Sequence, residues 1–357
     1  MSEQIRVGMI GTSWWSDWMH LPSLQSHPRV ALAAICGRTA EPAQRMAEKY
    51  RIPAVFTDYR RMLEDCALDA IALATPDDMH YEIATAVLDK RLHLLCEKPL
   101  ANDLQQAEEM ARRAIAAGVC HMTLFSWRWA PVFARLKLEI DTGSIGRPLE
   151  ARFAFLGNDA YSPEYRWRRD GGRCNGVLAD FGAHMIDFAR WCLGEIVSVS
   201  ADIATHIDRQ GIEPQPVNDC ATLDVLTETG AHATLALNAA AHLGDQIVRM
   251  NIEIYGTEGS LEGQMVLFGS EGGSWLRRYG GQAAAPETIH QERFRADSDE
   301  RPEFFSVFTE SSAGPRAFID AIVEKRPASP DLSDGAAAQR VIAAAFTAHE
   351  EGRRITL

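Results

Sequence analysis

Three residues of this chain carry side chains that can move protons or stabilise charge, and their positions suggest one site. Lys98 lies in the tripeptide Glu97-Lys98-Pro99, directly after an apolar run over 92–96 that predicts a buried strand. Ligands gather at the carboxyl ends of strands in open α/β sheets, so we expect Lys98 to point into a crevice. Asp180 and His184 are four residues apart in a predicted helix, and residues at that spacing face the same way.

The chemistry that suits these three residues is the oxidation of a secondary alcohol. Hydride leaves carbon while the hydroxyl loses its proton, so a base must lie within hydrogen-bonding reach of that oxygen. We assign this role to His184, with Lys98 stabilising the alkoxide and Asp180 binding substrate hydroxyls, although the roles of Lys98 and His184 are interchangeable on sequence grounds. Carboxylate and imidazole also bind divalent metals, but no third inward ligand is evident, so no metal site is expected.

The first part of the chain reads as alternating strands and helices, which is typical of βαβ units with a parallel sheet. A glycine after the last predicted helix of this part, Gly118, is expected to end it. Strands are predicted over 5–10, 30–36, 69–74, 92–96 and 120–125, and helices over about 41–50, 79–90 and 103–117.

The second part is dominated by strand patterns of period two, which predict a mainly antiparallel sheet with helices on one face. We therefore expect two domains, over 1–126 and 127–357. Strands are predicted over 150–156, 196–206, 219–227, 231–240, 247–255 and 259–267, helices over 132–141, 172–193, 314–325 and 333–350, and a long loop over 269–303. The last two helices are expected to pack on the second sheet.

The segment after the first strand resembles a dinucleotide-binding loop only in part. It reads Gly11-Thr12-Ser13, followed by two tryptophans, where Gly-x-Gly-x-x-Gly is usual. The first glycine suits the tight turn, and the backbone N–H groups of the following helix would meet a pyrophosphate. Ser13 is small enough for close approach and has a hydroxyl to donate.

The end of the second predicted strand bears on the choice between NAD and NADP. An acid usually grips the ribose 2′-hydroxyl of NAD there, but this chain has Arg38. A guanidinium matches the charge and geometry of a 2′-phosphate. The sequence therefore favours NADP over NAD without excluding NAD.

The strand-loop start, the Glu97-Lys98-Pro99 block and the Asp180/His184 block together resemble the glucose-fructose oxidoreductase, inositol dehydrogenase and rhizopine-catabolism (Gfo/Idh/MocA) family. The resemblance covers nearly the whole chain and implies an N-terminal Rossmann domain with a C-terminal domain built on a large, open-faced, mainly antiparallel sheet. It also implies a cis bond before Pro99, and it supports the grouping of Lys98, Asp180 and His184. On the same basis the residues near the nicotinamide are Thr75, Pro76, His80, Glu97 and Lys98. A helix-start role is the alternative for His80, and a structural salt bridge is the alternative for Glu97.

Four further residues are candidates for lining a sugar site, because arginine and aromatic groups suit polyhydroxyl ligands. These are Arg128, Tyr165, Arg168 and Asn175. Packing is the alternative for Arg128 and the aromatic groups, and an N-cap is the alternative for Asn175.

Composition narrows the class of protein. The 357 residues include 36 basic and 49 acidic side chains, a net charge of −13. This argues against binding to a nucleic acid or an anionic membrane, because the chain has no excess of positive charge to neutralise phosphates. No run reaches the roughly 18 apolar residues of a membrane span. Seven scattered cysteines without a Cys-x-x-Cys pair predict neither disulfides nor structural zinc, and the cytoplasm is the expected compartment.

The expected function is that of an NAD(P)-dependent oxidoreductase acting on a secondary alcohol of a sugar, inositol or related polyol. The family resemblance also implies a homodimer or homotetramer. Two alternatives stay open on sequence grounds: an NAD-dependent glycoside hydrolase of the same fold, and a non-catalytic regulator that senses dinucleotide. The sequence specifies neither the sugar nor the direction of reaction.

Overall fold

The computed structural model describes residues 4–162, 167–207, 217–280, 285–294, 301 and 303–357, and the chain divides into two units. The first unit contains residues 1–126 and 305–337, and the second contains 127–304 and 338–357. One boundary between the units lies after residue 126. The return to the first unit at residue 305 was not expected. The prediction that the helix over 314–325 packs on the second sheet is wrong, because helix α10 (Pro315–Glu324) packs on elements of the first unit, with Phe318 and Ile319 buried.

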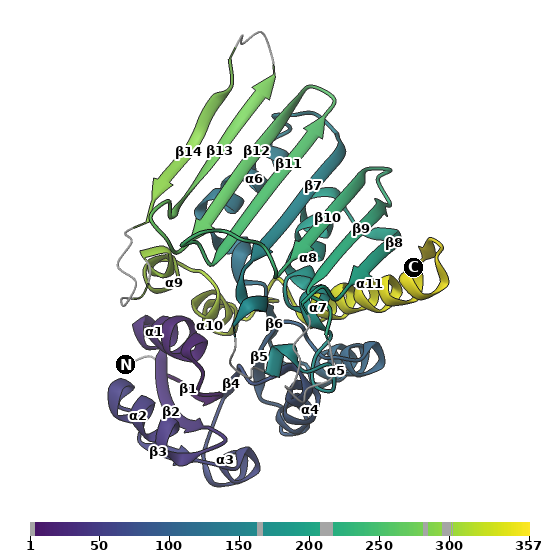
Figure 1. Cartoon of the computed structure of the whole chain (residues 1–357). Coiled ribbons are helices and arrows are strands. Elements are labelled where there is room, and N and C mark those ends of the chain that lie inside the picture. The colour runs from purple at the N-terminus through teal and green to yellow at the C-terminus, as the bar shows by residue number, and fades with distance from the viewer. Residues whose placement is uncertain (1–3, 163–166, 208–216, 281–284, 295–300, 302) are drawn as a thin grey trace. The chain divides into compact units, whose positions relative to one another are not determined.

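The first unit is built on a six-stranded parallel sheet, as predicted (Figure 1). The strand order is β3-β2-β1-β4-β5-β6, the order of a dinucleotide-binding doubly wound sheet. The central strand β4 is buried throughout, which explains its unbroken apolar sequence. The strands are β1 (Ile5–Ile10), β2 (Val30–Cys36), β3 (Ala54–Phe56), β4 (Ala70–Leu73), β5 (His93–Glu97) and β6 (His121–Leu124).

Helices connect these strands, and the helix α5 has clear capping residues at both ends. Asp103 accepts a hydrogen bond from the Gln106 N–H at 3.0 Å, and Gly118 takes the left-handed conformation that ends the helix, as predicted. The helical elements are η1 (Ser16–His20), α1 (Leu21–Ser26), α2 (Ala40–Tyr50), α3 (Tyr59–Asp65), η2 (Asp77–Met79), α4 (His80–Asp89), α5 (Leu104–Ala117), η6 (Glu303–Ser306) and α9 (Val307–Glu310).

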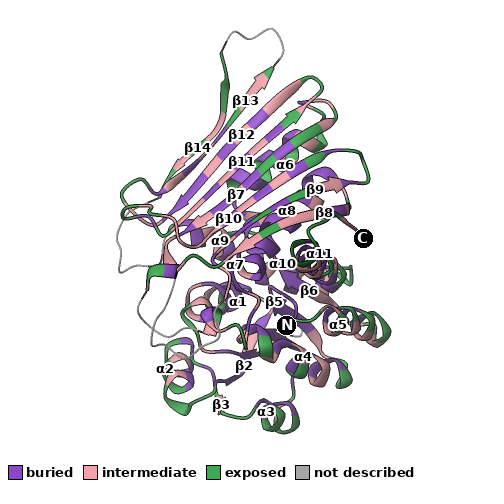
Figure 2. Cartoon of the chain, turned by 45° about the vertical axis from the view of Figure 1, so that its right-hand side comes forward, coloured by how far each residue is buried: buried purple, intermediate pink, exposed green. Residues whose placement is uncertain are grey.

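The second unit is built on a nine-stranded sheet in the order β14-β13-β12-β11-β7-β10-β9-β8-β15. Among the described strands of this sheet, only β7 and β10 pair in parallel, so the sheet is mainly antiparallel, as predicted. Several of its strands, such as β10, alternate between buried and more exposed residues, as the bands in Figure 2 show. The strands are β7 (Pro148–Gly157), β8 (Ile196–Ala204), β9 (Cys220–Thr227), β10 (His232–Asn238), β11 (Val248–Gly256), β12 (Gly259–Leu267), β13 (Gly273–Gly280), β14 (Glu287–Arg293) and β15 (Ile355–Thr356).

Two predictions for the second unit are wrong. The segment 269–303 contains the hairpin strands β13 and β14, whose polar edge residues hide the strand pattern. The predicted helix over 172–193 is interrupted at Phe181 between α7 and α8. The helical elements are η3 (Ser126–Trp129), α6 (Pro131–Asp141), η4 (Asp159–Tyr161), η5 (Trp167–Arg169), α7 (Gly176–Asp180), α8 (Gly182–Leu193) and α11 (Leu332–Glu351), the last passing from the first unit into the second.

Two further features of the described residues are the lengths of the apolar helices and the state of the cysteines. None of the helices in the described part of the chain is long and apolar enough to cross a membrane. The seven cysteines all lie in that part and are all free thiols.

Candidate active site

The carboxyl edge of the parallel sheet gathers most of the residues predicted to bind the cofactor. Gly11 follows β1, Arg38 follows β2, Thr75 follows β4, and Glu97 ends β5. Parallel strands end at one edge, and the strand order reverses between β1 and β4, which is where doubly wound sheets bind dinucleotides. The fold therefore brings these residues to the expected edge.

The turn at Gly11 requires glycine. Its φ is +122°, and a Cβ there would lie 2.1 Å from the carbonyl oxygen of Ala74. The Gly11 N–H donates to the carbonyl of Cys36 at 2.9 Å, which ties the turn to β2. Ser13 lies at the start of the following helix, with its hydroxyl 3.4 Å from that of Ser16. The first position of the loop therefore lies so close to the residue after β4 that only glycine fits there.

His80 connects two loops of this edge. It is the first residue of α4 and is fully buried, with Nδ1 2.9 Å from the Pro99 carbonyl and Nε2 3.0 Å from the Thr75 carbonyl. Burial lowers the pKa of His80, although both carbonyls favour the protonated ring. The ring therefore fixes the turns after β4 and β5 to each other.

Glu97 is a buried carboxylate held by two donors that the sequence analysis did not single out. Trp15 Nε1 donates to Glu97 Oε1 at 2.6 Å, and His20 Nε2 lies 2.8 Å from the same oxygen. Burial alone would raise the pKa of Glu97, but the bond and charge of His20, the charge of Lys98 and the Trp15 bond together lower it. A buried carboxylate requires hydrogen-bond donors. The burial of Glu97 is therefore the signal from which such donors could have been predicted.

The remaining cofactor-edge residues have surroundings that suit a dinucleotide. Arg38 is exposed and makes no ion pair within the described residues, so its guanidinium can reach a phosphate. The Thr75 hydroxyl is buried and has no hydrogen-bond partner in the part of the chain that the structure describes. A buried hydroxyl in that state favours a ligand that bonds to it. Lys98 is half-buried, and its bond to Pro99 is cis, as predicted.

Asp180 and His184 flank the break between two helices of the second unit. Asp180 is the last residue of α7, and His184 lies in the first turn of α8. Arg168 Nε is 3.4 Å from Asp180 Oδ2, so the structure pairs two of the predicted substrate-site residues. The His184 ring is 5 % exposed and contacts the ring of Trp127 at a centroid distance of 5.8 Å. An imidazole and a carboxylate held in this way can exchange a proton with a bound hydroxyl.

Asn175 precedes α7 as its N-cap residue, but its side chain makes no capping hydrogen bond. The side chain of Asn218 caps the helix instead. Its Oδ1 accepts a hydrogen bond from the Leu178 N–H at 3.0 Å, and its Nδ2 donates to the Asn175 carbonyl at 2.9 Å. Gly176 has a φ of +67°, and a Cβ there would lie 2.6 Å from the Asn218 carbonyl oxygen. Asn218 therefore sets the start of the helix that ends at Asp180.

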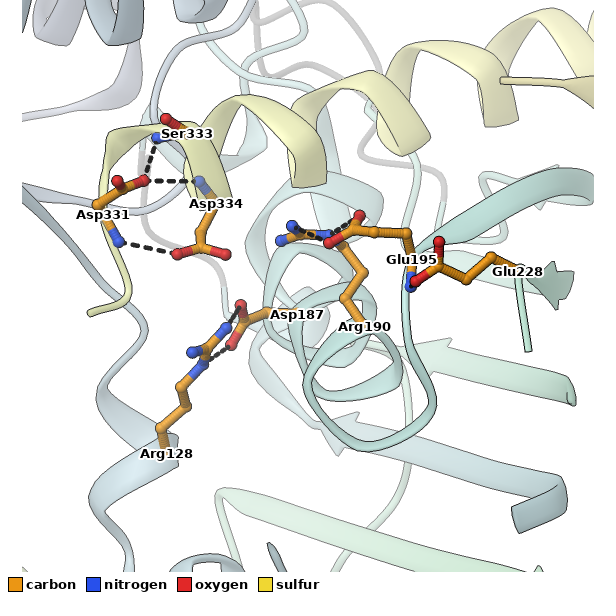
Figure 3. A network of polar contacts seen from close by, with 8 residues as sticks. All are labelled: Arg128, Asp187, Arg190, Glu195, Glu228, Asp331, Ser333 and Asp334. Atoms are coloured by element: carbon orange, nitrogen blue, oxygen red, sulfur yellow. Dashed lines mark hydrogen bonds and ion pairs between the residues drawn. The ribbon is translucent and has the colours of Figure 1, made fainter. Parts of the chain in front are cut away.

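Arg128 has a structural partner within the second unit. Its guanidinium makes a two-pronged ion pair with Asp187, at 2.7 Å and 2.6 Å, and both side chains are largely buried (Figure 3). This geometry satisfies the buried carboxylate of Asp187. Contact of Arg128 with substrate stays a prediction, and Tyr165 lies outside the described residues.

One group of side chains in the described part of the chain has the composition of a metal site. His206, Asp219 and Cys220 have ligand atoms within 4.8 Å of one another. The Asp219 carboxylate already accepts the backbone N–H groups of His206 and Ile207, which accounts for its burial. Asp180 and His184 are not members of this group.

Comparison with known proteins agrees with this architecture. Residues 5–125 match an oxidoreductase family with an NAD-binding Rossmann fold, and residues 133–262 match the GFO/IDH/MocA C-terminal domain. Levoglucosan dehydrogenase from Pseudarthrobacter phenanthrenivorans is 28 % identical over 242 residues, which cover 62 % of this chain and 62 % of that protein. Inositol 2-dehydrogenase 4 from Saccharopolyspora erythraea is 26 % identical over 358 residues, covering 99 % of this chain and 96 % of that protein.

A solved structure of levoglucosan dehydrogenase in complex with NADH and L-sorbose has the same fold, with a TM-score of 0.86, 23 % identity and 99 % coverage of both chains. The two family matches together span most of the chain and include both halves of the fold. The chain therefore belongs to the Gfo/Idh/MocA family of oxidoreductases, with an N-terminal NAD-binding Rossmann fold.

Proposed function

We propose that this protein is an NAD(P)-dependent dehydrogenase that oxidises a secondary alcohol of a sugar, inositol or related polyol. The observation that carries the proposal is the pairing of a dinucleotide-type sheet edge, which ends in Glu97 and Lys98, with a second unit in which Asp180 and His184 flank a helix break. Relatives named levoglucosan dehydrogenase and inositol 2-dehydrogenase support a substrate with several hydroxyl groups.

The cofactor would be held by residues of the parallel sheet edge. Gly11, Thr12 and Ser13 would meet the pyrophosphate through backbone N–H groups and hydroxyls. Arg38 would bind a ribose 2′-phosphate, which supports NADP, while the family's fold is described as NAD-binding. The turn Thr75-Pro76 and Glu97 would lie on the nicotinamide side. The bound nicotinamide supplies the acceptor for the hydride.

The protein's own residues would handle the proton and the orientation of the substrate. His184 would take the proton of the reacting hydroxyl, and its contact with Trp127 would hold the ring in place. Lys98 would stabilise the negative charge that develops on the oxygen. Asp180 would accept hydrogen bonds from substrate hydroxyls.

The substrate would be selected by groups that bind neighbouring hydroxyls. Arg168, which lies beside Asp180 and over the ring of Trp167 at 4.3 Å, offers a donor fork next to an aromatic face. Asn175 at the start of α7, together with Arg128 and Tyr165, are the other proposed contacts. This combination of donors, acceptors and rings favours a polyol over an apolar alcohol.

Two properties of the whole protein belong to the same proposal. Two strands of the nine-stranded sheet carry exposed large apolar side chains, Leu149 of β7 and Tyr255 of β11, which supports assembly as a homodimer or homotetramer. The seven free cysteines support the cytoplasm as its compartment.

Calorimetric titration with NADH and NADPH, followed by an absorbance assay for reduced cofactor across inositols, aldoses, uronic acids and amino sugars, tests the proposal. Binding followed by net cofactor reduction with one of these classes supports the dehydrogenase. If the protein binds cofactor and forms a product without net reduction of the cofactor, the result would contradict the dehydrogenase and favour the glycoside hydrolase. Absence of binding would overturn the cofactor assignment itself.

A further inference from the structure

The helix after the cofactor loop contains an uncommon feature. It runs from residue 14 to residue 26, and its segment Ser16–His20 is π-helical. The Leu21 N–H donates to the Ser16 carbonyl five residues earlier, as the wider π turn requires. Such turns are rare and are found frequently at functional sites, so this one calls for a reason.

The π turn explains how two residues of this helix reach one carboxylate oxygen. Trp15 and His20 are five residues apart. In a regular α-helix, neighbours on one face are three or four residues apart, whereas the i to i+5 repeat of a π turn aligns residues five apart. Trp15 Nε1 and His20 Nε2 lie 2.6 Å and 2.8 Å from the same atom, Glu97 Oε1. The π turn thus lets Trp15 and His20 both donate a hydrogen bond to the same carboxylate oxygen.

The contact is buried and joins distant parts of the sheet edge. His20 is fully buried and Glu97 nearly so. Within the described residues, His20 Nδ1 has no hydrogen-bond partner, and a carboxylate oxygen can only accept, so Nε2 carries the hydrogen that faces Glu97. The Trp15 ring also packs edge-on against Phe305 at 5.5 Å. Glu97 ends β5 while the helix follows β1, and β4 separates these two strands.

We propose that Trp15 and His20 are positioning residues that fix the end of β5, and with it Lys98, relative to the cofactor loop. Lys98 is the residue directly after Glu97, and its N–H lies 3.4 Å from Glu97 Oε2. Holding Oε1 from across β4 therefore sets the direction in which the chain leaves β5. Neither Trp15 nor His20 acts on the substrate. The contact of Trp15 and His20 with Glu97 is called the anchor below. This inference rests on the proposed function, because it assigns the anchor a role in the step that Lys98 assists.

The test compares matched variants of the full-length protein. Trp15→Phe removes the donor to Glu97 but keeps an aromatic ring, and Trp18→Phe makes the same chemical change in a ring that also packs edge-on against Phe305. His20→Leu removes the second donor, while His20→Gln keeps an N–H group near the position of Nε2. The readouts are kcat, KM for the polyol, the dissociation constant of NADH, and hydrogen exchange of the peptide over 93–101.

A displacement of about 1 Å at a reacting group can cost on the order of a hundredfold in rate. We therefore expect Trp15→Phe and His20→Leu to lower kcat by roughly ten- to a hundredfold, with KM and the NADH dissociation constant changed less than about threefold. His20→Gln should recover most of the lost rate. Amide protection over 93–101 should fall in Trp15→Phe and not in Trp18→Phe.

The exchange measurement separates this inference from the proposed function. Unchanged protection over 93–101 in both Trp15→Phe and His20→Leu overturns the inference whether or not the protein turns over an alcohol. The inference is also overturned if these variants keep the wild-type kcat and lose only thermal stability, because the anchor would then be a packing contact alone. A wild-type protein that reduces no cofactor overturns the proposed function, and the exchange result still decides whether the anchor fixes the strand end.

Discussion

Lys98 and His184 carry the proposed chemistry from different units of the chain, one directly after β5 and one in the first turn of α8. Replacing either by alanine should lower kcat at least about a hundredfold, because a positioned acid-base group or charge contributes on that scale. Dinucleotide affinity should change little. Steady-state kinetics with Lys90→Ala and His232→Ala as exposed controls checks this, and unchanged turnover in both Lys98→Ala and His184→Ala would contradict the assignment.

Arg38 is the residue that decides the proposed preference for NADP. Arg38→Asp replaces an exposed guanidinium by a carboxylate and should weaken NADPH binding by at least about tenfold, while NADH binding changes less. Arg45→Asp on the neighbouring α2 helix, where Arg45 pairs with Glu41, provides the control. Titration of both cofactors gives the ratio, and an unaltered NADPH dissociation constant would remove Arg38 from the cofactor site.

At the scale of single residues, the sequence predicted groups that follow a strand end or share a helical spacing. Gly11, Glu97 and Lys98 are of the first kind. Asp180 and His184 were assigned by the second, but the structure places them on either side of the break at Phe181, in α7 and α8. The partners that support them could not be read in this way, because their contacts are far apart in sequence. Trp15 meets Glu97 across 82 positions, and Asn218 meets Leu178 across 40.

The turn after β1 offers a test of the cofactor loop as an element. Gly11→Ala places a Cβ 2.1 Å from the Ala74 carbonyl oxygen, so the loop must shift away from β4. Dinucleotide affinity should fall by at least about tenfold. Gly118→Ala is the matched control, because Gly118 also has a positive φ but a Cβ there meets nothing within 4 Å. Equal effects of the two substitutions on NADH binding would argue against the loop as the pyrophosphate site.

The Arg128–Asp187 ion pair joins η3 to α8 in a buried setting. Removing one partner leaves a buried charge, so Arg128→Met should lower the free energy of unfolding by about 3–5 kcal/mol. The double variant Arg128→Met/Asp187→Leu should lose less than the sum of the single changes. Denaturant unfolding of the four proteins gives the coupling energy. Additive losses would mean that the pair contributes no mutual stabilisation.

The elements with long apolar runs were predicted well, and those defined by short or polar segments were not. The limits of β1 and β2 agree with the predicted ones residue by residue. Strand β3 has only three residues, too few to show a period. Strand β14 is mostly exposed, so no apolar alternation marks it. The break at Phe181 depends on the contacts of α7 and α8, which sequence periodicity does not contain.

At the scale of the whole molecule, stability should depend on pH through one buried and two half-buried histidines of the first unit. Burial lowers the pKa of His80, His93 and His121 below the usual 6.5. Nδ1 of His93 accepts the Cys120 N–H, and Nδ1 of His121 accepts the Leu332 N–H. The unfolded chain takes up protons first as pH falls, so the full stability present above about pH 6.5 is lost progressively below it.

Thermal unfolding at about pH 7.5 and about pH 5.5 measures this loss. His93→Asn and His121→Asn keep an acceptor near Nδ1 that does not titrate, so each should reduce the difference in unfolding temperature between the two pH values. The lowered pKa of Glu97 matters only at lower pH, below its usual 4.5. Equal stability at both pH values, or an unchanged difference in both variants, would contradict the assignment to these histidines.

The two-part architecture was predictable because strand patterning changes from buried parallel runs to alternating antiparallel ones. The assignment of 305–337 to the first unit was not, because an amphipathic helix such as α10 carries no mark of the sheet on which it packs. The same limit applies to the site: its residue types are visible in the sequence, whereas the burial and pairing that make them useful come from the fold.

Transfer of a labelled hydride tests the central claim most directly. A polyol that the protein oxidises, deuterated at its reacting carbinol carbon, is incubated with the oxidised cofactor, and both products are analysed by mass spectrometry. The account predicts one deuterium in the reduced nicotinamide and none at the carbon that becomes the ketone. Product that forms while the cofactor stays unlabelled would contradict a dehydrogenase.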